Sequence, residues 1–96
     1  MREMIDFFYD EASLCREKNE YAKAQSIETA GSMINNTFHG KEVNQWLPVV
    51  RNSIMSSISS LISNKRRDSM YQGEIEGYQY ALDMLDLIAD EYNVVL

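Results

Sequence analysis

The last third of the chain has the most regular spacing of apolar residues. An apolar residue recurs there every three or four positions, at Tyr71, Ile75, Tyr78, Leu82, Leu85, Ala89, Tyr92 and Leu96. Alternating steps of four and three residues form the heptad pattern of a helix that packs along its length against another helix. The pattern predicts a helix over residues 69–92, in which Ser69 and Gln72 have the spacing of a capping box.

Three further amphipathic segments come before this one. Apolar residues at helical spacing predict helices over residues 2–17, 21–36 and 43–63. Four Gly and one Pro among 96 residues leave few obligatory turns, which favours a few long helices over many short strands. The chain is therefore expected to be a single all-α domain, a three- to four-helix bundle of antiparallel helices that self-associates.

The boundary between the first two predicted helices is weakly marked. Lys18-Asn19-Glu20 is the expected turn, because Asn caps a following helix or adopts an unusual backbone conformation. One continuous helix through Tyr21 is the alternative, since no residue in this stretch breaks a helix. A stronger break lies at residues 35–40, which end in Gly40, a residue suited to a left-handed backbone. Pro48 is compatible with the third helix only near its start.

The chain is acidic, with a formal net charge of -6. This charge disfavours non-specific binding to DNA, RNA or anionic membranes, because their phosphates are repelled by the chain average. The N-terminal residues lack the apolar stretch of a signal peptide, and no run of about 18 apolar residues is present. Neither secretion nor a membrane span is expected. A cytoplasmic location, in a bacterium or a phage-infected cell, is the default expectation.

Residues that carry chemistry are sparse. His39 is the only histidine and lies in a predicted loop, with no second His or Cys at the spacing of metal ligands. Cys15 is the only cysteine and lies on the apolar stripe of the first helix, which is typical of a small buried side chain. No catalytic residue, metal ion or cofactor is therefore predicted. The protein is expected to act by binding and not as an enzyme.

Acidic residues gather in the last predicted helix. Residues 68–96 hold seven acids and no Lys or Arg, and Asp83, Asp86 and Asp90 share one helix face. Such a face is expected to contact a basic surface on a protein partner. Two alternatives are a face that is simply hydrated and a site for a hard cation, which oxygen ligands would hold.

Small residues recur on another side of the same helix. Gly73, Gly77 and Ala81 are four residues apart. Glycine inside a helix costs about 1 kcal/mol relative to alanine, so two glycines there require a structural reason. They predict the close approach of another helix or subunit, with space for a ligand as the alternative.

A basic run comes directly before the last helix. Arg66 and Arg67 precede Tyr71 and Tyr78, and guanidinium groups bind phosphates while tyrosine rings stack on bases. A nucleotide or small phosphate ligand is therefore a second candidate partner. The alternative is structural, because the two tyrosines also lie on the heptad pattern and basic residues complement the C-terminal end of the preceding helix.

The segment from Tyr71 to Leu82 contains Gly73-Glu74-Ile75-Glu76-Gly77 followed by Ala81-Leu82. It resembles the final helix of many small phage and prophage accessory proteins. The resemblance covers about a dozen residues and implies a protein-binding regulator or inhibitor encoded by a mobile element. It assigns no role to any single residue. A nucleotide-binding oligomer and a structural or assembly component are the alternatives.

Overall fold

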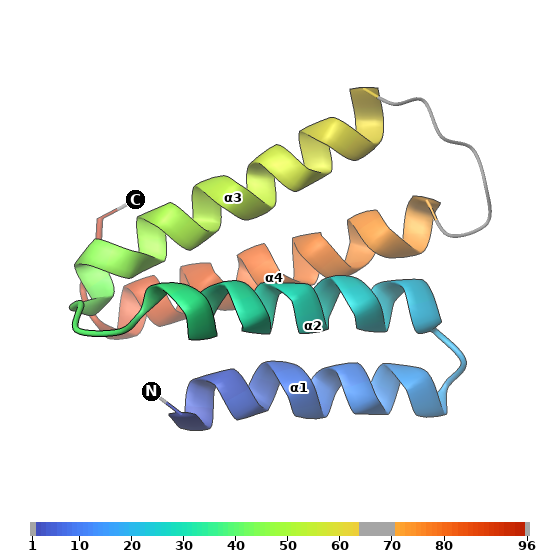
Figure 1. Ribbon diagram of the computed structural model, residues 1–96, viewed down its shortest axis with the longest axis horizontal. Coiled ribbons are helices and arrows are strands. Elements are labelled where there is room, and N and C mark those ends of the chain that lie inside the picture. Colours follow the sequence, from blue (N-terminus) through green and yellow to red (C-terminus); the bar gives the residue numbers. More distant parts are fainter. Residues whose placement is uncertain (1, 64–70, 96) are drawn as a thin grey trace.

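The computed structural model describes residues 2–63 and 71–95, which form four α-helices and no strand (Figure 1). The helices are α1 (Arg2–Glu17), α2 (Tyr21–Thr37), α3 (Val43–Ser63) and α4 (Tyr71–Glu91). The predicted all-α class is confirmed. The capping box at Ser69 and the first two positions of the helix predicted over residues 69–92 lie outside the described residues.

A left-handed asparagine ends α1. Asn19 has a φ of 64°, and its backbone N–H donates to the carbonyl of Arg16 at 3.0 Å. The N–H of Glu20 donates to the carbonyl of Cys15 at 2.8 Å. These two bonds form a Schellman motif, which satisfies carbonyls that the helix leaves free. α1 and α2 are therefore separate helices, and the alternative of one continuous helix through Tyr21 does not hold.

The connection from α2 to α3 combines a left-handed glycine with a side-chain cap. Gly40 has a φ of 67°, a backbone conformation that side chains with a Cβ rarely adopt. The side chain of Gln45 accepts a hydrogen bond from the backbone N–H of Glu42 at 2.8 Å, which is half of a capping box at the start of α3. Pro48 lies inside α3, close to its first turn.

α2 and α4 form the centre of the molecule, because α2 packs against all three other helices and α4 packs against both α2 and α3. Gly73 of α4 lies against Ala22 of α2, and Gly77 lies against Ser26. Moving four residues along one helix thus moves four residues along the other, so α2 and α4 run in the same direction. Figure 1 shows α2 between α1 and α3.

The buried core takes residues from all four helices. Its largest fully buried side chains are Trp46, Phe8, Ile5, Ile27, Ile34, Leu47, Ile54 and Leu85. Burying side chains of this size contributes about 1.5–3 kcal/mol each to folding. The core therefore lies where α2 and α4 meet, with α1 and α3 closing it on either side.

The heptad pattern of α4 is only partly buried. Ile75, Leu85 and Ala89 are buried, but Tyr92, on the same pattern, is 52% exposed. The buried face of α4 also includes Gly77 and Ala81. The reason is steric, since the small residues let α2 approach more closely than a face of large side chains would allow.

Candidate functional site

The small residues of α4 lie against α2. A Cβ atom placed on Gly77 would lie 2.5 Å from the backbone oxygen of Lys23 and 2.7 Å from the Cβ of Ser26. A Cβ on Gly73 would lie 3.0 Å from the Cβ of Ala22. Ala81, the third small residue, is fully buried. The neighbour that approaches this face is therefore a helix of the same chain.

The three aspartates of the predicted partner-binding face are all exposed. Asp86 Oδ1 lies 3.3 Å from Nε of Arg51 on α3. No ion pair is found for Asp83 or Asp90 among residues 2–63 and 71–95. The sequence does not predict the pairing of Asp86 with Arg51, because the two residues are 35 positions apart.

The acidic face extends to the C-terminal end of α4, where negative charge destabilises a helix. The last turn contains no basic residue, while Asp90 and Glu91 are exposed there. The C-terminal end of a helix carries a partial negative charge, so each acid there destabilises the helix by about 0.3–1 kcal/mol. The position of these acids therefore reduces helix stability.

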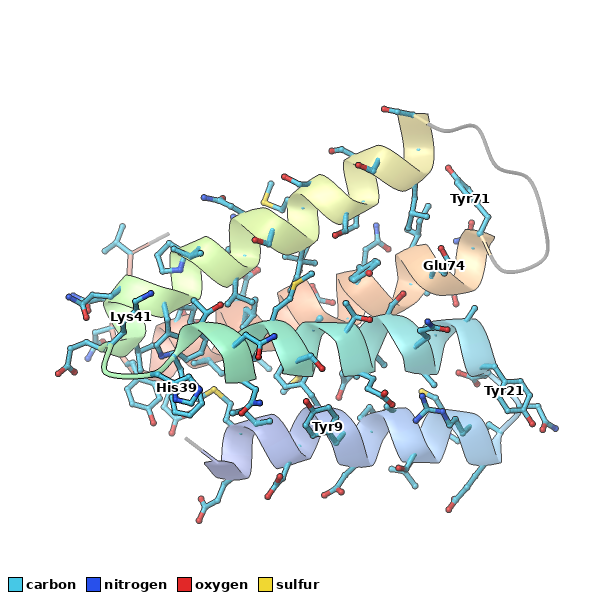
Figure 2. The ribbon with its side chains drawn as sticks, viewed as in Figure 1. Tyr9, Tyr21, His39, Lys41, Tyr71 and Glu74 are labelled. Carbon is cyan, nitrogen blue, oxygen red and sulfur yellow. The ribbon has the colours of Figure 1, made fainter. Side chains whose placement is uncertain are left out.

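The predicted phosphate site is divided by the limits of the described residues. Arg66 and Arg67 lie outside them. Tyr71 and Tyr78 are half-buried in the first turns of α4, and Figure 2 shows Tyr71 at the start of this helix. Tyr78 lines a hollow of about 320 Å³ between α3 and α4, together with Ser56, Ser57, Ser60, Leu61 and Glu74.

A second hollow, of about 500 Å³, lies at the beginning of α2 beside Gly73. Lys23 is the one basic residue among those that line it, and its Nζ lies 3.7 Å from the carboxylate of Glu20. Glu76 lines the same hollow. Acids thus outnumber bases around this space, which gives it no preference for an anion.

An apolar groove that sequence reasoning missed lies between the start of α1 and the end of α4. It has a volume of about 290 Å³, with Met4, Phe7 and Phe8 of α1 on one side and Met84, Ile88 and Tyr92 on the other. Glu3 and Glu91 complete its lining. One signal was present in the sequence, because Phe7 and Leu14 make the apolar stripe of α1 wider than one helix contact requires.

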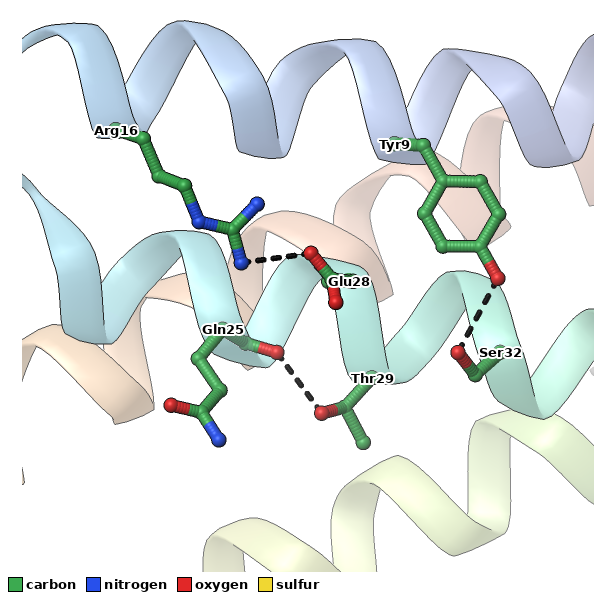
Figure 3. A network of polar contacts seen from close by, with 6 residues as sticks. All are labelled: Tyr9, Arg16, Gln25, Glu28, Thr29 and Ser32. Atoms are coloured by element: carbon green, nitrogen blue, oxygen red, sulfur yellow. Dashed lines mark hydrogen bonds and ion pairs between the residues drawn. The ribbon is translucent and has the colours of Figure 1, made fainter.

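Polar contacts join α1 to α2 (Figure 3). Nη2 of Arg16 lies 2.6 Å from a carboxylate oxygen of Glu28. The hydroxyls of Tyr9 and Ser32 are 3.2 Å apart. Because Arg16 pairs with α2, its charge does not offset the acids on the α4 side of α1.

The other reactive side chains form no described site. His39 is exposed, and its ring stacks on that of Phe38 with centroids 4.5 Å apart. Cys15 is 3% exposed, and burial raises the pKa of its thiol, which lowers its reactivity as a nucleophile. Within residues 2–63 and 71–95, no three His, Cys, Asp or Glu residues are grouped so that they could hold a metal ion.

Comparison with models of known protein families, with curated proteins and with solved structures gives no match. None of the four described helices has both the length and the apolar character needed to cross a bilayer. The fold and the candidate surfaces thus define an all-α acidic protein with an exposed carboxylate face and an apolar groove.

Proposed function

We propose that the protein acts by binding, as a regulator or inhibitor whose acidic α4 face contacts a basic surface on another protein. The observation that carries this proposal is the exposed pair Asp83 and Asp90, for which no ion pair is found in the described part of the chain. Long-range attraction would speed the association of such a face with a basic partner. Charge pairs that are desolvated in the complex would make the binding selective.

The cost of these acids supports a binding role. Asp90 and Glu91 oppose the dipole at the end of α4, and Asp86 and Asp90 repel each other across one helical turn. Residues that reduce stability without a folding benefit are characteristic of functional surfaces. The resemblance of residues 71–82 to phage accessory proteins favours an inhibitor or adaptor over an assembly component.

The proposal includes a four-helix bundle in which consecutive helices are antiparallel. The short connection at residues 18–20, which contains the left-handed Asn19, supports this arrangement. Self-association is part of the same expectation, but it must use a surface other than Gly73, Gly77 and Ala81, because α2 covers them. Light scattering at low and high salt would measure the solution mass.

Nucleotide binding by Arg66, Arg67, Tyr71 and Tyr78 stays an alternative prediction. The hollow beside Tyr78 offers hydroxyl groups from three serines of α3. A thermal-shift screen with mono-, di- and cyclic nucleotides would detect such a ligand through stabilisation of the folded state.

The acidic face can be tested with a synthetic peptide of lysine and serine as the basic probe. We expect the pair Asp83→Asn with Asp90→Asn to weaken binding about fivefold at low salt, because two unscreened charges are lost. The control pair Asp6→Asn with Glu17→Gln removes the same charge from exposed positions of α1. Equal weakening by both pairs would mean that net charge, and not this face, attracts the probe.

A further inference from the structure

The groove between α1 and α4 leaves apolar surface in contact with solvent. Phe7 of α1 is 44% exposed and Tyr92, just after α4, is 52% exposed, although both line the groove. Phe8 and Ile88 form a buried part of the same lining. The groove therefore has a buried apolar base and aromatic side chains at its sides that are partly exposed to solvent. Adjacent exposed apolar side chains mark interaction sites.

The apolar surface extends along both helices beyond the groove itself. Leu14 is seven residues after Phe7, so it lies two turns further along the same side of α1, and it is 49% exposed. Leu87, on α4, is 60% exposed and lies about 100° around the helix from Ile88, towards solvent. A partner that fills this surface needs apolar residues over about two helical turns, which is the i, i+3 or i+4, i+7 pattern of a helix in a groove.

Acids border this apolar surface on both helices. Glu3 lines the groove from α1, and Asp10, exposed seven residues later, lies on the same side. Glu91 lines it from α4, and Asp83 and Asp90 follow on the adjoining solvent face. Among the described side chains of α1, Arg16 is the one base, and it pairs with Glu28 of α2.

This charge pattern selects the kind of occupant. A second copy of the chain placed symmetrically on this groove would bring Glu3 and Glu91 towards equivalent carboxylates, which is unfavourable. An anionic lipid surface or a nucleic acid would be repelled by the same acids. A helix with apolar residues on one side and Lys or Arg beside them would cover the exposed apolar side chains of the groove and pair with the acids at its border.

We propose that the α1–α4 groove is the docking site for a basic amphipathic helix of a protein partner, with Phe7, Leu87 and Tyr92 covering its apolar side. This inference rests on the proposed function, since the acidic α4 face forms one border of the groove. The groove adds apolar anchors, which give affinity that salt does not screen, to the charges that steer the approach.

The test uses a synthetic amphipathic helix of leucine and lysine. Its control is a peptide of identical composition with the leucines spread around the helix. We expect wild-type protein to bind the amphipathic peptide at least about tenfold more tightly than the scrambled one, because only the former presents a continuous apolar side. Equal affinity for both peptides overturns the docking proposal.

The pair Phe7→Ser with Leu87→Ser tests the apolar surface directly, because Phe7 lines the groove and Leu87 is exposed on α4 next to Ile88. It should weaken binding of the amphipathic peptide about tenfold and leave binding of the lysine and serine peptide unchanged. The matched control, Val49→Ser with Ile62→Ser, removes comparably exposed apolar side chains from α3 and should change neither. If the Phe7 and Leu87 pair binds like wild type while the Asp83 and Asp90 pair is weakened, the groove inference fails and the acidic-face proposal stands. If no peptide binds, both fail.

Methionine methyl resonances locate the bound peptide on the wild-type protein without any substitution. Met4 and Met84 line the groove, whereas Met55 is on α3 and contacts Arg51. The amphipathic peptide should shift the signals of Met4 and Met84 and leave that of Met55 in place. Shifts confined to Met55 would place the peptide on α3 and overturn the proposal. A wild-type dimer that Phe7→Ser with Leu87→Ser dissociates would make the occupant a second copy and would also overturn it.

Discussion

At the scale of single residues, Gly77 controls how close α2 and α4 come. The atoms nearest to its missing side chain are a backbone oxygen and a Cβ, neither of which can rotate away. Contact this close is possible only without a Cβ on α4. The small residue therefore has a packing role inside the chain, which explains why a poor helix former is present in the middle of a helix.

Gly77→Ala should reduce the free energy of unfolding by about 2 kcal/mol. The gain in helix propensity, about 1 kcal/mol, is smaller than the cost of pushing two packed helices apart. Urea unfolding can be followed by the fluorescence of Trp46, the only tryptophan, which is fully buried. The control is Gly73→Ala, where the nearest atom lies 3.0 Å from the new Cβ, and its effect should stay within about 1 kcal/mol of zero. Equal stability of Gly77→Ala and wild type would contradict the packing role.

At the scale of elements, the end of α4 combines a good cap with unfavourable charge. Asn93 has a φ of 57°, and the N–H of Val94 donates to the carbonyl of Ala89 at 2.8 Å. This motif repeats the one at the end of α1 and satisfies the last carbonyls. The acids of the final turn then oppose the helix dipole without a basic residue to balance them.

Asp90→Asn should stabilise the protein by about 0.5 kcal/mol at low salt. The substitution removes a charge from the negative end of α4 and relieves repulsion from Asp86. Thermal unfolding at low salt and at about 1 M salt measures the effect, which should shrink as screening increases. Asp83→Asn, two turns from the end, is the control and should have a smaller effect. A less stable Asp90→Asn variant would show that Asp90 stabilises the fold.

At the scale of the whole molecule, the packing of α1 onto the α2–α4 pair buries two groups that titrate at alkaline pH. Burial raises the pKa of the Cys15 thiol above 9.0. Burial, helped by the charge of Glu11 on α1, raises the pKa of the Tyr80 hydroxyl above 10.0. Both groups are neutral in the folded state at neutral pH, and unfolding would let each lose its proton more easily.

The free energy of unfolding should therefore fall as the pH rises above about 9. Below the unfolded pKa values of Cys15 and Tyr80 the contribution is complete, and it is lost as the pH passes through the raised folded values. Urea unfolding between about pH 8 and about pH 11 measures this slope. Cys15→Ala and Tyr80→Phe should each flatten it, and Tyr21→Phe, at an exposed position, should not. An unchanged slope in Cys15→Ala would exclude the thiol as a source.

Most of the helices could be predicted from the sequence, because their causes are local. Apolar spacing, the left-handed Asn19 and Gly40, and the early position of Pro48 each act within a few residues. The exposure of Asp83, Asp86 and Asp90 followed from the same spacing. These features depend on hydrogen bonds and side-chain directions within one or two turns of a helix.

Only the tertiary structure decided which surfaces meet. The heptad pattern predicted burial of Tyr92, but α2 packs against Gly73 and Gly77, which are not on that pattern, and Tyr92, just after the end of α4, is 52% exposed. The pairing of Arg51 with Asp86, and the groove that brings Phe7 beside Tyr92, join residues far apart in the chain. Such contacts depend on how whole helix faces fit together, and several fits satisfy the same local pattern. Shape complementarity between the helices determines which of these fits forms, and this packing also creates the groove between α1 and α4.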